Sequence, residues 1–268
     1  MLYCYFSSVK EGFSEIEPLT SSINHEKYYG TKINNESSDE LYSFLFEDVY
    51  YKDNDYESQS TEIAHAILKY SNSVYNHLID ASSKCGHVSE LLKNSFDTKC
   101  MDKSQSMVDY HKFKYNDHRI IQGELDNQGV LRSNSFTHAC ILHYDIYDYP
   151  NLDDIMINMS NILIEKGILF IHVLNSMKHI QNYYSDTRDL LNGNFVYASN
   201  LTHKKGSEYT LIEKIRNENS NKERKNMVSK TFYSNDHIVY IANTFGFEHI
   251  ANESLSDHDM LLVFKKTN

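Results

Sequence analysis

The stretch "LIDASSKCGHVSELL", residues 78–92, determines which fold this 268-residue chain can adopt. Two apolar residues, Leu78 and Ile79, end a short strand pattern, and the acid Asp80 follows them directly. A short polar turn then leads into an amphipathic helix pattern. Strand, tight turn and helix in this order begin a βαβ unit, and ligands of such units bind at the turn, beyond the carboxyl end of the strand.

The alternation of strand and helix patterns continues downstream of this stretch. Strand patterns occupy 77–81, 98–102, 118–124, 136–144 and 167–174, and helix patterns occupy 87–95, 104–113 and 152–164. This rhythm implies right-handed crossovers and a mostly parallel sheet. We predict an α/β fold with a central, mostly parallel sheet. The carboxyl ends of the strands place Asp80, Asp102 and Glu124 along one rim.

The flanking segments follow other patterns. Residues 1–40 are polar and weakly periodic, so we expect a loose N-terminal arm, followed by one domain over 41–268. Helix patterns over 39–51 and 56–71 open this domain. A period-2 pattern within 183–232 predicts a small antiparallel insert.

The end of the chain returns to one helix pattern and one strand pattern. "SNDHIVYIANTFGFEHI", residues 234–250, predicts a helix that Ser234 or Asn235 caps and that Gly246 ends. "DMLLVFKK", residues 259–266, predicts the final strand of the main sheet. The antiparallel insert therefore interrupts the main sheet before its last helix and strand.

Charge and composition exclude several classes of partner. The net charge of −11 argues against nucleic acid, because proteins that bind it carry a basic footprint for phosphates. The basic run "NKERKN", residues 221–226, has acids around it, so we expect a solvated loop. No stretch reaches the ~18 apolar residues of a membrane helix, and no signal-peptide pattern opens the chain. Four cysteines without paired spacing fit reduced thiols, so we expect a cytoplasmic protein.

Five motifs in order carry a resemblance to a known family. Residues 78–92 resemble the loop D-x-G-x-G-x-G of class I S-adenosylmethionine (SAM) methyltransferases, and "KCMDKSQSMVDYHK" (99–112) resembles their G-x-D-x-S-x-x-M. "IIQGELDN" (120–127), the stretch 135–173 and "FYSNDHIVYIANTFGFEHI" (232–250) resemble the later motifs. The resemblance runs from about residue 40 to the end. It implies the Rossmann-like class I methyltransferase fold, with a central seven-stranded, mostly parallel sheet and helices on both of its faces, and SAM as the cofactor.

An upstream segment resembles one subfamily more closely. "VYYKDNDYESQSTEIAHAI", residues 49–67, is similar to the N-terminal segment of amino-sugar N,N-dimethyltransferases, which act on nucleotide-linked sugars. Those enzymes also carry an antiparallel insert that they use in part for dimer contacts. The resemblance implies a small-molecule acceptor, with a nucleotide-linked amino sugar as the leading candidate, and a possible homodimer.

The resemblance also implies which residues hold the cofactor. Asp102 would accept the ribose hydroxyls, although it could instead cap the following helix. Glu124 would receive the adenine amino group, or lie as a solvated loop acid. Tyrosines including Tyr56 would form a lid, or pack a helix on the sheet. The full expected set is Tyr56, Asp80, Ser82, Gly86, Asp102, Lys103, Glu124, Leu125 and Leu142.

The chain departs from the family in its glycine loop. Lys84 stands where the middle glycine lets the backbone approach the methionine part of the cofactor, and a positive φ there costs a lysine ~1 kcal/mol or more. An inward ammonium would repel the sulfonium, but it could also turn outward or pair with the cofactor carboxylate. Thr137 replaces the aspartate of a "FD" pair, and Glu165 and Lys166 replace the Pro-Gly of "L-x-P-G-G".

Methyl transfer is an in-line displacement, so the protein mainly binds, excludes water and orients the nucleophile. An amine acceptor must be neutral, which a base can secure. His143 and Asp148, with Asp145 between them, follow the fourth strand and are our candidates, although His143 could be a buried, satisfied histidine. We expect no metal, because no H-x-x-x-H or C-x-x-C spacing occurs.

Two functions stay open at this point. The first is a SAM-dependent methyltransferase that acts on an amine or hydroxyl of a small molecule. The second is an inactive methyltransferase-like protein that serves as a binding or regulatory subunit, because its loop has lost glycines. Other nucleotide sites fit less well: the chain has no P-loop, no G-x-S-x-G, and no G-x-G-x-x-G for NAD. Nothing basic supports a protein or RNA acceptor.

Overall fold

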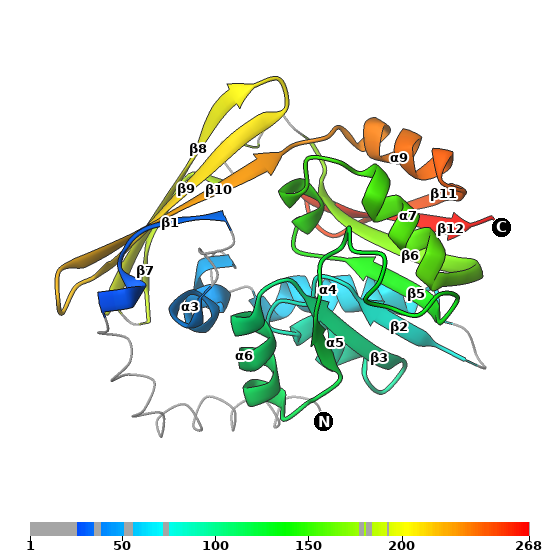
Figure 1. The fold of residues 1–268 in the computed structure, drawn as a ribbon, viewed down its shortest axis with the longest axis horizontal. Coiled ribbons are helices and arrows are strands. Elements are labelled where there is room, and N and C mark those ends of the chain that lie inside the picture. Colours follow the sequence, from blue (N-terminus) through cyan, green and yellow to red (C-terminus); the bar gives the residue numbers. More distant parts are fainter. Residues whose placement is uncertain are drawn as a thin grey trace.

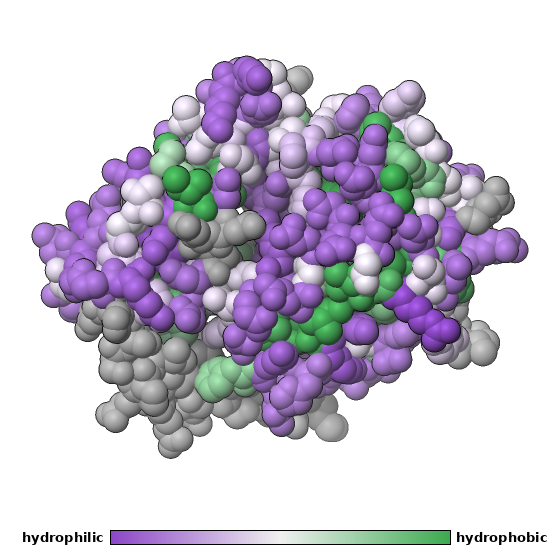
Figure 2. All heavy atoms as spheres, viewed as in Figure 1, coloured by the Kyte–Doolittle hydropathy of each residue, from purple (hydrophilic) through white to green (hydrophobic). Residues whose placement is uncertain are grey.

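The computed structural model describes residues 26–34, 39–50, 56–71, 75–176, 180, 184–191 and 193–267. This part of the chain forms two sheets that face one another across helix α3 (Glu40–Tyr50) (Figure 1). Figure 2 shows that the face seen in Figure 1 is mostly hydrophilic, in keeping with the high content of charged residues. None of the helices described is long and apolar enough to cross a membrane.

The larger sheet has seven strands, as predicted, and is mostly parallel. Strand β12 alone runs antiparallel to both of its neighbours, β6 and β11. The spatial order is β11 (Phe247–Ser254), β12 (Asp259–Lys266), β6 (Leu163–Leu174), β5 (Phe136–Ile141), β2 (His77–Asp80), β3 (Asp97–Asp102) and β4 (Ile120–Gln122).

Helices cover both faces of this sheet because each strand alternates its side chains between them. Leu78 of β2 packs with helices α4 and α5, whereas its neighbour Ile79 packs with α7 and α9. Both residues are fully buried. The helices are α4 (Tyr56–Leu68), α5 (His87–Leu92) and α6 (Gln105–Tyr115) on one face, and α7 (Asp153–Ile162) and α9 (Asn235–Thr244) on the other.

The order of the strands reverses between β2 and β5, and this point positions the site. From β2 the chain runs outward to β3 and β4, then returns to β5 on the other side of β2. The loop after β2 and the segment after β5 therefore meet, as ligand-binding loops of α/β sheets do. Ser82 joins them: its Oγ accepts a hydrogen bond from the Leu142 amide (2.7 Å) and donates one to the Leu142 carbonyl (3.1 Å).

The second sheet, here called the accessory sheet, has five strands. Four of them lie within the predicted insert and are antiparallel. The fifth, β1, comes from the N-terminal segment and pairs in parallel with β10. The order is β1 (Gly30–Ile33), β10 (Lys222–Thr231), β9 (Glu208–Asn217), β8 (Phe195–Lys205) and β7 (Asp186–Leu190).

Three details differ from the predictions. Residues 30–33, expected in a loose arm, form β1 because the edge of β10 offers them a partner, not because their own pattern alternates. The expected solvated loop 221–226 was wrong, since most of it lies in β10, where Arg224 is fully buried. Strand β11 was not expected, and it begins directly after Gly246, which ends α9 with φ 84°.

Helix α3 packs against both sheets at once. Leu41, Leu45 and Val49, one face at helical spacing, join the core of the accessory sheet. Phe46, on a neighbouring face, packs against Cys85 of the loop after β2. Helix α3 therefore fixes the accessory sheet above the rim of the main sheet.

A buried ion pair anchors the start of α3 to the accessory sheet. Arg224 of β10 is 0% exposed, and its Nη1 lies 2.5 Å from Oδ2 of Asp39. The same guanidinium donates to the Asn226 side chain (2.7 Å) and to the Tyr28 carbonyl (3.2 Å). Asp39 also accepts from the Tyr42 amide (3.1 Å) with its other oxygen. Removal of the charge on Asp39 would take away the carboxylate that lies 2.5 Å from a buried guanidinium.

We expect Asp39→Asn to lower the free energy of unfolding by about 3 kcal/mol, because asparagine can still accept from the Tyr42 amide but cannot balance the charge of Arg224. Glu223→Gln, an exposed change on the same strand, is the matched control and should change it by less than about 0.5 kcal/mol. Urea denaturation followed by fluorescence and circular dichroism measures both. Equal effects of the two variants would contradict the importance of the pair.

Candidate functional site

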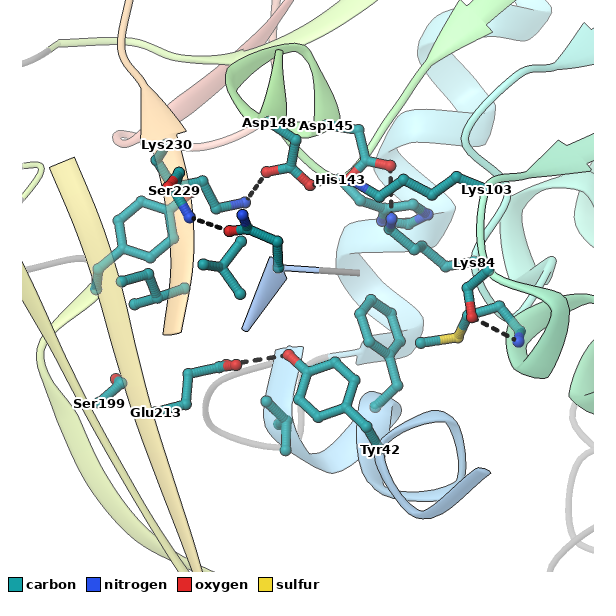
Figure 3. A pocket seen from close by; sticks show the side chains of 18 of the residues that line it. Tyr42, Lys84, Lys103, His143, Asp145, Asp148, Ser199, Glu213, Ser229 and Lys230 are labelled. Atoms are coloured by element: carbon teal, nitrogen blue, oxygen red, sulfur yellow. Dashed lines mark hydrogen bonds and ion pairs between the residues drawn. The ribbon is translucent and has the colours of Figure 1, made fainter. Parts of the chain in front are cut away.

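A pocket of about 450 Å³ lies between the rim of the main sheet and the accessory sheet (Figure 3). Helix α3 contributes Tyr42 and Phe46 to its wall. The main domain and the accessory sheet contribute the titratable and charged lining residues: Lys84, Lys103, His143, Asp145, Asp148, Asp186, Arg188, Glu213 and Lys230. The pocket is thus apolar on one side and densely charged on the others.

Lys84 projects into this pocket from the loop after β2. Its φ is 49°, the positive value expected from the glycine that the family resemblance places there. Its amide donates to Asp102 Oδ2 (2.9 Å), and its Nζ donates to Asp145 Oδ2 (2.5 Å) and lies 3.8 Å from Asp102 Oδ2. Burial disfavours the ammonium, but the carboxylates of Asp102 and Asp145 outweigh it and raise the pKa of Lys84. The side chain is a buried cation with fixed partners.

A second group of ions stands beside this pair. Asp148 accepts from Lys103 Nζ (2.9 Å) and from Lys230 of β10, so one carboxylate joins the main domain to the accessory sheet. Burial alone would raise the pKa of Asp148, but Lys103 and Lys230 hold it well below its usual range. The pKa of Lys103 is raised by Asp148 in spite of burial. Asp148 therefore carries its charge at neutral pH.

His143 lines the pocket next to Lys84. It has φ 57° and a buried side chain, and its ring meets the ring of Phe46 edge to face at 6.3 Å between centroids. Burial, and then the ammonium of Lys84, lowers the pKa of His143 well below its ordinary value. The imidazole is therefore neutral at physiological pH, the form that a base must have, and the same shift makes it a weak base.

Asp102 lies just behind the pocket wall and is 1% exposed. Its Oδ2 accepts from the Lys84 amide and its Oδ1 from the Ser104 amide, each at 2.9 Å. The cap of α6 is Ser104, whose hydroxyl accepts from the Met107 amide (3.3 Å), so Asp102 is not the cap. Amide hydrogen bonds instead hold the carboxylate at the carboxyl end of β3.

Gly86 ends the loop at the start of α5. Its φ is 77°, and a Cβ there would lie 2.0 Å from Cε1 of His111. A side chain at this position would strain the backbone and would overlap the His111 ring. The one glycine left in the loop is therefore required by packing as well as by backbone geometry.

The remaining expected cofactor residues lie apart from the pocket. Glu124 is exposed on an open cleft of about 680 Å³, which shares Lys103 with the pocket. Leu125 is buried, and its amide donates to the Tyr149 hydroxyl (3.3 Å). Ser82 and Leu142 bond to one another in the interior, and the Tyr56 side chain lies outside the described part of the structure.

The structure thus brings Lys103, His143 and Asp148 together on one pocket, with Asp102 behind them. The accessory sheet adds residues that the sequence did not single out. Lys230 is one, and Glu213 is another, a buried acid that accepts from Tyr42 (3.0 Å), Tyr197 (2.9 Å) and Asn226 (3.2 Å). No motif marks them; period-2 alternation alone predicts which strand residues face inward. Among the residues described, no cluster of histidine, cysteine and acids could hold a metal.

No family model and no curated protein matches the sequence. Solved structures do match the fold. A SAM-dependent methyltransferase from Clostridium acetobutylicum is 16% identical with a TM-score of 0.67, covering 85% of this chain and 97% of that one. CalS10, an amino pentose methyltransferase of Micromonospora echinaspora solved with SAM bound, is 14% identical with a TM-score of 0.64, covering 78% and 90%. The chain has the class I SAM-dependent methyltransferase fold.

A third structure widens this likeness. The sugar N-methyltransferase KedS8 from Streptoalloteichus is 14% identical with a TM-score of 0.63, and the match covers 91% of this chain and 100% of that one. The accessory sheet and the main sheet are therefore both within the matched length. The expected Rossmann-like methyltransferase architecture is confirmed, and the roles of individual site residues stay predictions.

The residues at the switch point fit SAM in part. The fixed carboxylate of Asp102 and the open cleft beside Glu124 suit the ribose and base of the cofactor. The turn at Lys84 does not suit its methionine part, because a paired ammonium stands where a glycine would leave room.

Two buried carboxylates beside the site have pKa values shifted in opposite directions. Asp80 is 1% exposed, and burial raises its pKa to about 6, although Ser89 donates to Oδ2 (2.8 Å). Burial would also raise the pKa of Asp259, but the hydrogen bonds that its carboxylate accepts lower this pKa to about 2. Its partners are Gln59 (2.8 Å), Tyr144 (2.9 Å), His172 (3.2 Å) and Ser256.

We expect Gly86→Ala to lower the free energy of unfolding by about 2–4 kcal/mol, because it adds overpacking against His111 to a positive-φ penalty. The double variant Gly86→Ala/His111→Ala should show a sub-additive loss, since it removes the clash but keeps the penalty. Chemical denaturation of the three variants measures this, with His111→Ala alone as the control. A fully additive loss would contradict the clash.

Asp80→Asn and Asp259→Asn should respond to pH in opposite senses. The folded state holds the Asp80 proton up to about pH 6, so the free energy of unfolding of wild type falls as pH rises from about 4 to 6. Asp80→Asn has no proton to lose there and should not show this loss, which amounts to as much as about 3 kcal/mol. Charged Asp259 stabilises above about pH 4, and this stability fades as pH falls through about 2, so Asp259→Asn destabilises at pH 7. Denaturation midpoints from pH 3 to 8 test both signs. Parallel curves for wild type and Asp80→Asn would contradict the shift.

Proposed function

We propose that the chain is a SAM-dependent methyltransferase that methylates an amine or hydroxyl of a small molecule. The observation that carries the proposal is the placement of Asp102, His143 and an enclosed pocket at the switch point of a methyltransferase fold. Ligands of open α/β sheets bind at this point. The fold provides the cofactor class, and the pocket provides a space for an acceptor.

The residues divide the work by position. Asp102 would hold the ribose and Glu124 the adenine amino group, each at the carboxyl end of its strand. When bound, SAM supplies a methyl group that a nucleophile in line with the sulfonium can accept. His143 is neutral and lines the pocket, so it would take the proton that an amine or hydroxyl releases. Asp148 is held charged by two lysines and would orient the acceptor rather than act as a base.

The size of the pocket supports a small acceptor. About 450 Å³ lies in the range of sites for small ligands, and the accessory sheet covers it on one side. A nucleotide-linked amino sugar is the leading candidate on the sequence resemblance of residues 49–67. The edges of the accessory sheet, β1 and β7, are strands to which a second copy could add, so a cytoplasmic homodimer is part of the proposal.

One observation favours a second function. Lys84 is paired and buried in the position that the methionine part of the cofactor would need. A protein in which this lysine never moves would keep the methyltransferase fold but serve as a binding or regulatory subunit. The two functions differ in whether the site takes up cofactor at all.

Titration calorimetry with SAM and with S-adenosylhomocysteine separates them. We expect micromolar binding to wild type that weakens about 100-fold in Asp102→Ala, because two hydrogen bonds to a charged acceptor are lost. Asp109→Ala, an exposed change on α6, is the control and should bind as wild type does. Thermal melts confirm that each variant is folded. Binding that survives in Asp102→Ala would contradict the ribose role, and absence of binding in every variant would favour the second function.

A further inference from the structure

We propose that Lys84 is an internal competitor for the cationic cofactor: its ammonium occupies the Asp145 carboxylate that would otherwise face the positive sulfonium. This inference rests on the proposed function. It gives Lys84 a specific effect, which is to weaken binding of SAM more than binding of the uncharged product S-adenosylhomocysteine. A side chain that merely filled space would weaken both ligands alike.

The position of Lys84 carries the first step of the argument. It stands in the loop between β2 and α5, the turn that approaches ligands in this class of sheet. Figure 3 shows its side chain directed across the pocket to Asp145, which begins the segment η5 (Asp145–Asp148) after β5. The Nζ–Oδ2 distance of 2.5 Å makes this contact a direct ion pair. The lysine thus spans the two loops that meet at the switch point.

The balance of charge around the pocket carries the second step. Of the carboxylates at this rim, Asp145 pairs with Lys84, and Asp148 pairs with Lys103 and Lys230. Farther away, Asp186 pairs with Arg188 at 3.3 Å. Glu213, on the accessory sheet, is held instead by hydrogen bonds from Tyr42, Tyr197 and Asn226. A sulfonium that entered beside Asp145 would add a positive charge next to a carboxylate that already has its cation. A neutral thioether would add none.

The cost of keeping Lys84 in place carries the third step. A lysine at φ 49° is strained by ~1 kcal/mol or more, and a fixed lysine loses side-chain entropy. Its ion pairs with Asp145 and Asp102 must offset both costs. If Lys84 leaves, the buried carboxylate of Asp145 loses its nearest cation, and a cationic ligand is then favoured over a neutral one. Whether Lys84 stays or moves, its removal therefore benefits SAM more than S-adenosylhomocysteine.

The test is the ratio of two dissociation constants in three variants. We expect Lys84→Met to strengthen SAM binding about tenfold or more, and S-adenosylhomocysteine binding less than about threefold, in calorimetric titrations at fixed salt. Lys93→Met is the matched control, because it removes an exposed lysine that pairs with Glu90 and lines neither the pocket nor the cleft, and it should leave the ratio near that of wild type. A ratio of the two ligands is insensitive to a general loss of stability.

The double variant Lys84→Met/Asp145→Asn isolates the carboxylate and avoids an unpaired buried charge. It should lose the selective gain for SAM and bind both ligands with similar affinity. Equal changes for the two ligands in Lys84→Met, or the same selective gain in Lys93→Met, would overturn the inference while Asp102-dependent binding left the proposed function intact. Failure of both ligands to bind wild type and Lys84→Met would overturn the inference and the proposed function together.

Discussion

The structure depends on one packing constraint: α3 must bury two apolar faces at the same time. Leu41 and Leu45 require the accessory sheet, and Phe46 requires the loop after β2. Because the helix satisfies both, it holds the accessory sheet over the rim and encloses the pocket. Enclosure removes water, and lysines and acids without water must pair with one another. The ion pairs of Lys84 and Asp148 are therefore a consequence of how α3 packs, although α3 supplies no charged partner to either of them.

The main sheet could be predicted from sequence because its signals are local. Each buried strand is a short apolar run, and Asp80 and Asp102 follow two of these runs directly. The accessory sheet was predicted only in part, because polar residues occupy both the inward and the outward positions of β10. Arg224 and Asn226 point inward while Glu223 is exposed. Composition suggested a solvated loop there. Only the partner Asp39, distant in sequence, makes a buried arginine acceptable.

The site divides in the same way. The positive φ of Lys84 was expected because it reflects the backbone of the turn, a local property. The direction of its side chain was left open, since it depends on where Asp145 lies after the sheet has formed. The contact of Asp148 with Lys230 was out of reach for a similar reason: the two residues are 82 positions apart. Sequence spacing describes turns, whereas charge pairing across sheets is a property of the assembled fold.

Two lysines show that this fold accepts a non-glycine residue where the backbone conformation favours glycine. Lys84 and Lys166 both have a left-handed backbone, with φ 49° and 63°, at positions where the resembling family has glycine. The positive φ is therefore adopted without glycine, at a cost of only ~1–2 kcal/mol for each of the two lysines. At Gly86, by contrast, His111 leaves no room for a methyl group, and glycine itself is required. A glycine signature in this fold therefore reflects the need for space beside the turn more than the need for a left-handed backbone. Proteins of this architecture can lack the signature and keep the backbone geometry.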